Sequence, residues 1–360
     1  IIQDELKKVL AYGTIENIGI IFIALGLSLA FKANGMTAAA ALAFTAALLH
    51  ILNHALFKAS LFFGAGAMIT ATGEKTIERL GGLIKLMPKT AILFLIASLA
   101  IAALPPLNGF VSEWLLLQGI LLTPALPQWG LRLLAPVAGI VFALSAALGA
   151  ACYVRVYGIS FLGRARSKSA EHAREVDDWS LGAMLGLLIV CISIGLVPGL
   201  MIDAISPVTE SLVGGRLPAQ HFSQWLTIAP ITEVRSSYNG FLVALFVVIS
   251  GLTAYWIVHR LWPRPVRYAP AWDCGYVDPT PLSQYSASSF AQPIRRALGG
   301  VAYTAVEHLD MPKPGDVRVA KFGVEIKDRA MIYLYGPICA AVLTASNQLN
   351  GFNYLKIQEY

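Results

Sequence analysis

The sequence predicts an all-α fold, a polytopic bundle of transmembrane helices, and three observations lead to this prediction. Of the 360 residues, 56% are hydrophobic and only 13% are charged, whereas a soluble domain carries about 25% charged residues. Long apolar stretches alternate with short polar ones, which is the pattern of a polytopic helical membrane protein. Basic residues gather at the ends of the apolar stretches, so the net charge of +6 indicates membrane topology and not nucleic-acid binding.

Seven segments are long enough and apolar enough to be expected as membrane spans. They cover about residues 14–31, 37–71, 88–104, 107–123, 131–162, 180–201 and 239–262. A helix needs about 20 residues to cross the hydrocarbon, so the two longest segments must tilt, kink or protrude.

The fourth span begins directly after Leu104–Phe110, where two prolines and a glycine prevent a continuous helix from the third span. A short segment interrupted by glycine and proline is typical of a broken helix that lines an ion or substrate path. The alternative is a tight turn between two ordinary helices.

Residues 1–262 are therefore expected to form a transmembrane domain, and residues 263–360 a polar cytoplasmic segment with a lateral, interfacial helix. Residues 330–346 are apolar but short and contain Gly336 and Pro337, so they fit either that interfacial helix or a weak eighth span. The sequence opens in the middle of the pattern, which predicts that an N-terminal part precedes it.

The positive-inside rule predicts that residues 163–169 and the tail after Arg260 lie on one side, the cytoplasmic side, because two predicted spans separate them. Residues 73–89 are also basic. Three predicted spans separate them from residue 163, so they are expected on the opposite side, in conflict with the rule.

Three protonatable groups lie within one of the predicted spans. His50, His54 and Lys58 follow one another at intervals of four residues, so they line about 12 Å of one helix face. An ionisable group at the centre of a membrane helix costs about 2.5 to 3.5 kcal/mol and marks a functional site by default. Since histidine exchanges protons near neutral pH, the stripe favours a proton relay over a set of hydrogen bonds between helices.

Further charged groups lie at or near the predicted spans. Glu113 follows the expected break, where a carboxylate beside freed carbonyls can bind a proton or cation; the alternative is a first-turn carboxylate that complements the helix dipole. Glu16, at the start of the first span, is a candidate for the same pathway role, and its alternative is also to complement the helix dipole. Lys7 could be an interfacial anchor. Arg155 is expected to be an interfacial anchor and not a pathway group.

Motifs for bond chemistry are absent from the sequence. It has no nucleophile elbow, phosphate loop or metal-ligand cluster, and its four cysteines, Cys152, Cys191, Cys274 and Cys339, form no C-x-x-C pair. We expect a non-catalytic chain that holds no metal or cofactor of its own and that moves or holds something.

Three motifs resemble the antiporter-like membrane subunits shared by respiratory complex I, Mrp antiporters and membrane-bound hydrogenases. They are "LKKVLAYGTIENIG", "LLHILNHALFKASLFFGAGAM" and "LPPLNGFVSEWLL", and they occur in the family's order within residues 5–125. The "IENIG" stretch and the segment Pro263–Gly299 resemble the hydrogenase branch, in particular hydrogenase-4 component B and formate hydrogenlyase subunit 3.

The resemblance implies a fold of two inverted repeats of five helices, each with a broken helix, followed by a lateral helix. This chain would hold most of the second repeat. The family's channel residues fall on Lys7, His50, His54, Lys58 and Glu113, although Glu5 replaces the aspartate that usually precedes the lysine.

The resemblance also implies a function and partners. The chain would move protons or sodium ions across the cytoplasmic membrane of a prokaryote, coupled to redox chemistry in other subunits. Those partners would be further membrane-arm subunits and a soluble arm that holds a [NiFe] centre and iron–sulfur clusters; no nucleic acid is expected. The alternatives are an Mrp-type cation/proton antiporter subunit, a complex I NADH–quinone oxidoreductase subunit and a membrane anchor that moves no ion.

Overall fold

The computed structural model describes residues 2–220, 226–228, 230, 237–261, 268, 275, 280–300, 303–313, 315–318 and 320–350. Cys274 and His221 lie outside these residues. The chain divides into two compact units, Gln3–Ala287 and Ser288–Tyr360. They are described separately below.

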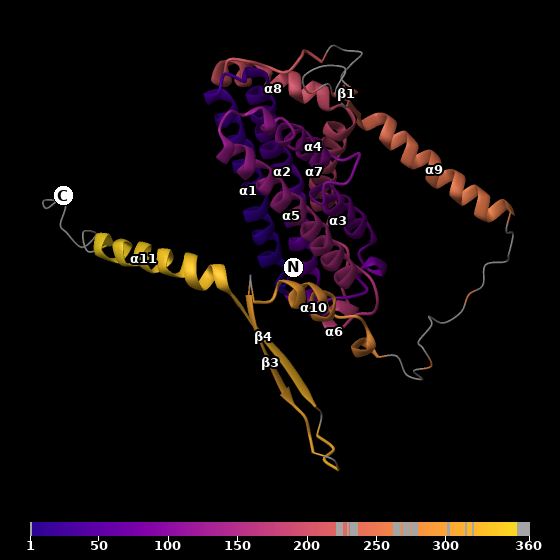
Figure 1. The fold of residues 1–360 in the computed structure, drawn as a ribbon. Coiled ribbons are helices and arrows are strands. Elements are labelled where there is room, and N and C mark those ends of the chain that lie inside the picture. The colour runs from indigo at the N-terminus through magenta and orange to yellow at the C-terminus, as the bar shows by residue number, and fades with distance from the viewer. Residues whose placement is uncertain are drawn as a thin grey trace, which may run out of the picture. The chain divides into compact units, whose positions relative to one another are not determined.

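The first unit is a helical bundle built around one long central helix (Figure 1). The helices α1 (Leu6–Ala33), α3 (Pro88–Ile101), α4 (Asn108–Ile120), α5 (Trp129–Phe161) and α7 (Asp178–Leu196) accompany α2 (Thr37–Thr72). Over its most apolar window α2 is 61% buried, compared with 39% for α1 and 11% for α5. The predicted helical membrane fold is confirmed, and all seven predicted spans contain a helix.

Among the residues that the structure describes, five helices, α1, α2, α5, α7 and α9 (Gly240–Leu261), have the length and composition to cross a membrane. The side chains of α9 are exposed along the helix, for example Phe246 at 72% and Leu252 at 63%. A helix that is apolar on all sides suits a lipid environment, so these features describe a multi-pass membrane chain.

The third and fourth predicted spans are short helices that meet inside the bundle. α3 has 14 residues and α4 has 13, so each is about 20 Å long and shorter than the hydrocarbon core. A Cβ on Gly109 would lie 2.0 Å from the carbonyl oxygen of Ala100, so the first turn of α4 packs directly on the last turn of α3. The predicted break is present, and we infer that α3 and α4 together complete one crossing.

The expectation that residues 73–89 and 163–169 lie on opposite sides is wrong. The N–H of Gly82 donates to the carbonyl of Leu162 at 2.9 Å, and the guanidinium of Arg166 donates to the carbonyl of Leu80 at 3.3 Å. The error arose because α3 and α4 were counted as two crossings. With one crossing fewer, both basic segments share an end of the bundle, as the positive-inside rule requires.

Short elements connect and cover the helices of the bundle. They are η1 (Ile77–Arg79), η2 (Leu83–Lys85), η3 (Thr123–Ala125), α6 (Lys168–Glu171), α8 (Pro198–Val213), β1 (Thr227–Ile228), β2 (Tyr238–Asn239) and η4 (Pro281–Ser283). The predicted span 180–201 is two helices, because α7 ends at Leu196 and Pro198 begins α8. Proline suits the first position of a helix, where no N–H is needed. It also disfavours a helical conformation of the residue before it, and Val197 is not helical, with φ of −127° and ψ of 60°.

The apolar core of the bundle forms two clusters. One contains residues from the second half of α2, such as Leu61, together with Phe94 and Phe161. The other contains residues from the first half of α2, such as Leu42, together with Phe31 and Leu115. The residues of α2 between the two clusters include His50, Asn53 and His54. We call this part of the bundle the polar layer, because it separates the two apolar clusters.

The second unit contains α10 (Ala287–Leu298), a β-hairpin of β3 (Tyr303–Asp310) and β4 (Lys321–Asp328), the π-helix η5 (Met331–Tyr335) and α11 (Gly336–Asn350). The two strands lie side by side (Figure 1) and are antiparallel, with Tyr303 opposite Asp328 and Asp310 opposite Lys321. The hairpin was not expected from the sequence. Residues 331–350 are helical and exposed, and the interfacial helix expected there stays a prediction.

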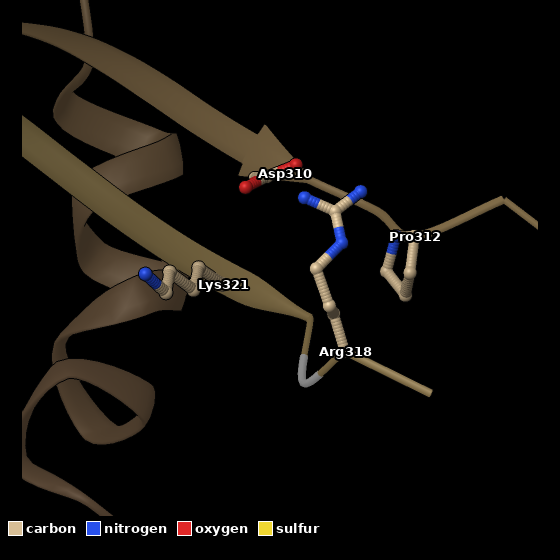
Figure 2. Close-up of a pocket in the computed structure, with 4 residues that line it drawn as sticks. All are labelled: Asp310, Pro312, Arg318 and Lys321. Carbon is tan, nitrogen blue, oxygen red and sulfur yellow. The ribbon is translucent and has the colours of Figure 1, made fainter. Parts of the chain in front are cut away.

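A shallow hollow of about 250 Å³ lies at the end of this hairpin (Figure 2). Asp310, Pro312, Arg318 and Lys321 line it. Of the charged side chains that line it, Arg318 pairs with Asp316 at 2.7 Å. We assign it no function.

Candidate functional site

The predicted stripe on α2 faces the interior of the bundle. The exposed fractions are 2% for His50, 0% for Asn53 and 5% for Lys58, and His54 is half-buried. The polar groups therefore lie among packed helices, where each needs a hydrogen-bond partner.

His50 uses both of its ring nitrogens. Nδ1 lies 2.9 Å from the hydroxyl of Ser112 on α4, and Nε2 lies 3.2 Å from Oδ1 of Asn17 on α1. The amide of Asn17 is oriented by its own bond, because its Nδ2 donates to the carbonyl of Gly13 at 2.7 Å. His50 thus links three helices at the polar layer.

A pair of asparagines fixes the start of α4 against α2. Nδ2 of Asn53 donates to the carbonyl of Asn108 at 2.8 Å and to the hydroxyl of Ser112 at 3.0 Å, while Nδ2 of Asn108 donates back to Oδ1 of Asn53 at 3.1 Å. Asn108 opens α4, so its carbonyl also lies at the start of the helix's own hydrogen-bond ladder. The bonds between the two asparagines and to Ser112 hold the first turns of α4 against α2.

His54 stands between His50 and Lys58 on α2. Its Nε2 is buried, and among the described residues it has no hydrogen-bond partner. Its ring packs edge-on against Phe57, with 5.8 Å between the ring centroids. A buried imidazole nitrogen without a fixed partner can accept or release a proton without breaking an existing bond.

Lys58 ends the stripe at a point where α1, α2 and α5 meet. Its Nζ donates to the carbonyl of Leu10 at 2.8 Å and to the hydroxyl of Tyr153 at 3.2 Å. A Cβ on Gly13 would lie 2.7 Å from both Nζ and the Tyr153 hydroxyl. Glycine at position 13 therefore leaves the room that the ammonium group occupies.

The two candidate carboxylates lie on different helices. Glu16 on α1 is half-buried and accepts a hydrogen bond from the hydroxyl of Ser145 on α5 at 2.9 Å, and its charge acts on Lys58. Glu113 on α4 is 9% exposed and directly follows Ser112. Neither lies in the first turn of its helix, so the alternative of dipole complementation is wrong for both.

The structure does not bring Lys7 to the other candidates, because its side chain is exposed in the first turn of α1. Its predicted role in the pathway stays a prediction.

Arg155, expected as an interfacial anchor, is 1% exposed. Its guanidinium donates to the carbonyls of Gln3 at 2.7 Å and Ala287 at 2.9 Å and pairs with Asp4. Its side chain is buried and ties together segments of the chain, so it is not an exposed anchor.

Several residues of this site were missed in the sequence. They are Asn17, Asn53, Asn108, Ser112, Ser145 and Tyr153. Asn53 could have been found, because it follows His50 by three residues and so shares its helix face. Tyr153 carries no such signal, since 95 residues separate it from Lys58.

In the described parts of the chain, no group of three His, Cys, Asp or Glu side chains is placed to hold a metal ion.

Comparison with known proteins agrees with this architecture. Residues 1–135 match the family described as "NADH:quinone oxidoreductase/Mrp antiporter, TM". The chain is 33% identical over 336 residues to hydrogenase-4 component B of Escherichia coli (strain K12), covering 91% of this chain and 48% of that protein. It is 33% identical over 306 residues to formate hydrogenlyase subunit 3 of the same strain, covering 84% of this chain and 47% of that protein.

A solved structure shares the fold. It is that of the membrane-bound sulfane sulfur reductase, an archaeal respiratory membrane complex, with a TM-score of 0.55 and 23% identity, covering 80% of this chain and 48% of that one. The chain thus spans about half the length of the relatives it matches. These findings confirm the resemblance seen in the sequence: the chain is similar to the antiporter-like membrane subunits of the hydrogenase, complex I and Mrp family.

Proposed function

We propose that this chain is half of an ion-translocating membrane subunit and that it carries a proton along the polar layer of the bundle. The observation that supports this is a row of titratable groups inside the bundle. Glu113 lies on the broken helix, His50, His54 and Lys58 follow along α2, and the charge of Glu16 acts on both Lys58 and Glu113. When the ion taken up from solution is H⁺, the internal charge carrier is the protonated side chain.

Coulomb coupling would move the proton from one group to the next. Neighbours in the stripe are four residues apart, which is about 6 Å along a helix. Two unit charges at this separation interact by about 3 kcal/mol at an effective dielectric constant of 20. A change of charge at one group therefore alters the protonation of its neighbour, and the groups titrate as a coupled set.

The redox role is proposed from similarity. Hydrogenase-4 component B and formate hydrogenlyase subunit 3 match over most of this chain, so we propose that it works in a membrane-bound [NiFe] hydrogenase assembly. The nickel–iron centre and the iron–sulfur clusters would belong to partner subunits, and further membrane subunits would complete the arm in the cytoplasmic membrane of a prokaryote. Redox chemistry in those partners would change the charge at one end of the row.

An Mrp-type antiporter is the second candidate, because the family that matches residues 1–135 includes Mrp subunits. The full-length protein, purified with its partners in sealed proteoliposomes, distinguishes the two. A hydrogenase assembly evolves hydrogen from reduced methyl viologen and acidifies or alkalises the lumen as it does so. An assembly that evolves no hydrogen, but exchanges Na⁺ for H⁺ across an imposed gradient, would favour the antiporter.

A further inference from the structure

Ser112 lies at the meeting point of the histidine and the broken helix. Its hydroxyl oxygen has three neighbours: Nδ2 of Asn53 at 3.0 Å, Nδ1 of His50 at 2.9 Å and the carbonyl of Gly109 at 3.1 Å. A hydroxyl has one proton to donate and two lone pairs with which to accept. Asn53 donates to one lone pair, so a single proton and a single lone pair remain for His50 and Gly109.

The other side of His50 determines which nitrogen is protonated. Oδ1 of Asn17 is an acceptor only, and it faces Nε2 because the Asn17 amide donates to Gly13. Nε2 therefore carries a proton whether His50 is neutral or charged. In the neutral ring, Nδ1 is an acceptor and competes with the Gly109 carbonyl for the one proton of Ser112.

The charged ring resolves this competition. When His50 takes a second proton, Nδ1–H donates to Ser112, and the Ser112 hydroxyl is left to donate to Gly109. Every donor and acceptor of the group is then paired, which matters in a layer where Ser112 is 1% exposed. A regular α-helix pairs the carbonyl of Gly109 with the N–H of Glu113, so the hydroxyl reaches the turn that carries the candidate carboxylate.

We infer that Ser112 is a positioning residue whose hydroxyl changes acceptor with the protonation of His50, from Nδ1 when the ring is neutral to the Gly109 carbonyl when it is charged. This inference rests on the proposed function, and it identifies Ser112 as the link between the stripe on α2 and the first turn of α4. A serine hydroxyl that bonds back to a carbonyl of its own helix can bend that turn. The helix break would then sense the charge on His50.

Other titratable groups surround this link. Those that are buried or half-buried on the elements packed against α2, within the described residues, are Glu16, His54, Lys58, Glu113, Cys191 and Asp203. Within the described residues, none of these groups hydrogen-bonds to Ser112. The Ser112 hydroxyl therefore responds to His50 through a direct hydrogen bond and to the other groups only through their electrostatic effect on His50.

A spectroscopic experiment tests the geometry without any transport. Solid-state NMR of the full-length protein in membranes, labelled with ¹⁵N-histidine, gives the tautomer of each ring, and the His50→Gln spectrum identifies the His50 signals. We expect neutral His50 to carry its proton on Nε2, and Ser112→Ala to shift the Nδ1 signal to that of a nitrogen without a hydrogen bond. A proton on Nδ1 of the neutral ring, or an Nδ1 signal unchanged in Ser112→Ala, would overturn the inference.

Ion movement in proteoliposomes of the complete assembly tests the role. Ser112→Ala should slow translocation by about tenfold, the effect of losing one hydrogen bond to a charged group, and Ser112→Thr should restore it. Ser98→Ala is the matched control, because it also removes a buried hydroxyl but one without a partner among the described residues; it should translocate like the wild type.

The failures of the two proposals differ. If Lys58→Ala and Glu113→Gln stop translocation while Ser112→Ala leaves it unchanged, the proposed function stands and the role of Ser112 is overturned. Equal damage in Ser112→Ala and Ser112→Thr would also overturn it, because the hydroxyl would not be the group that matters. If Lys58→Ala and Glu113→Gln translocate normally, both proposals fall.

Discussion

The ammonium group of Lys58 on α2 lies 3.2 Å from the hydroxyl of Tyr153 on α5 and 2.8 Å from the carbonyl of Leu10 on α1. The contact holds the end of the titratable stripe against two neighbouring helices. A lysine head group in a membrane bundle needs such acceptors, because an ammonium without them is very costly to bury. The position of the proton at this end of the row therefore depends on α1 and α5 as well as on α2.

Removing the hydroxyl of Tyr153 should slow translocation. Tyr153→Phe keeps the ring but removes an acceptor of a charged donor, a bond worth about 1.5 to 3 kcal/mol. We expect translocation about tenfold slower and a lower thermal unfolding midpoint, measured in proteoliposomes and by a melt in detergent. Tyr157→Phe on the same helix is the control, because Tyr157 is half-buried and packs its ring against Phe161; equal effects of the two substitutions would contradict a specific role of Tyr153.

Gly13 should tolerate no side chain when Lys58 is in place. The Cβ of Gly13→Ala would lie 2.7 Å from Nζ of Lys58 and from the hydroxyl of Tyr153, so the flexible lysine must move away. We expect a large loss of translocation with a small change in the thermal unfolding midpoint. Gly26→Ala is a control on the same helix, because a Cβ there meets nothing within 4 Å, and a Gly13→Ala variant as active as Gly26→Ala would refute the packing argument.

Arg155 should matter for stability and not for the pathway. Its buried guanidinium holds the carbonyls of Gln3 and Ala287 and the carboxylate of Asp4, and breaking one side of a buried ion pair costs roughly 3 to 5 kcal/mol. Because Asp4 is partly exposed, we expect about 3 kcal/mol for Arg155→Ala, near the lower end of that range. Arg132 is an exposed arginine of the same helix, and Arg132→Ala should change the free energy of unfolding by less than about 0.5 kcal/mol. Equal thermal unfolding midpoints for the two variants would disprove the stabilising role of Arg155.

The N-terminus of α7 should lose its cap in acid. The hydroxyl and N–H of Ser180 donate to Asp177 and lower the pKa of this carboxyl below its ordinary value. A lowered pKa in the folded state means that the cap stabilises the fold above the unfolded pKa of about 3.9 and loses this contribution as the pH falls through the folded pKa. Asp177→Ala should remove that part of the pH dependence of thermal unfolding between pH 6 and about pH 3, and identical curves for variant and wild type would contradict it.

The sequence was sufficient to predict the membrane fold, because apolar stretches long enough to cross a bilayer are typical of membrane helices. Helices lie in all the predicted spans, and the break before α4 was visible as prolines and glycine at Leu104–Phe110. Helix ends were less predictable: α1 begins at Leu6 and not near residue 14, because its polar first turns hid the start. The side on which residues 73–89 lie depended on knowing that α3 and α4 are halves of one crossing. The lengths of these helices and the contacts of Gly82 with Leu162 and of Arg166 with Leu80 revealed this.

The stripe on α2 was predictable because one helix determines it. The partners of that stripe were not, since they come from other helices and depend on packing. Asn17, Ser112 and Tyr153 approach His50 and Lys58 from α1, α4 and α5, and serine, asparagine and tyrosine are too common in membrane helices to indicate a site. The hairpin of β3 and β4 was missed because its strands lie in a polar stretch that reads as a connecting segment.

Proton movement through Lys58 and Glu113 is the central claim, and one measurement tests it most directly. The complete assembly would be reconstituted in sealed vesicles that contain a pH-sensitive dye, and hydrogen evolution would be driven while the lumenal pH is followed. Lys58→Ala and Glu113→Gln should abolish the pH change while the assembly and its hydrogen evolution persist, and the exposed controls Lys85→Ala and Glu171→Gln should behave like the wild type. A pH change of wild-type rate in Lys58→Ala and Glu113→Gln would contradict the account and leave these groups a structural role only.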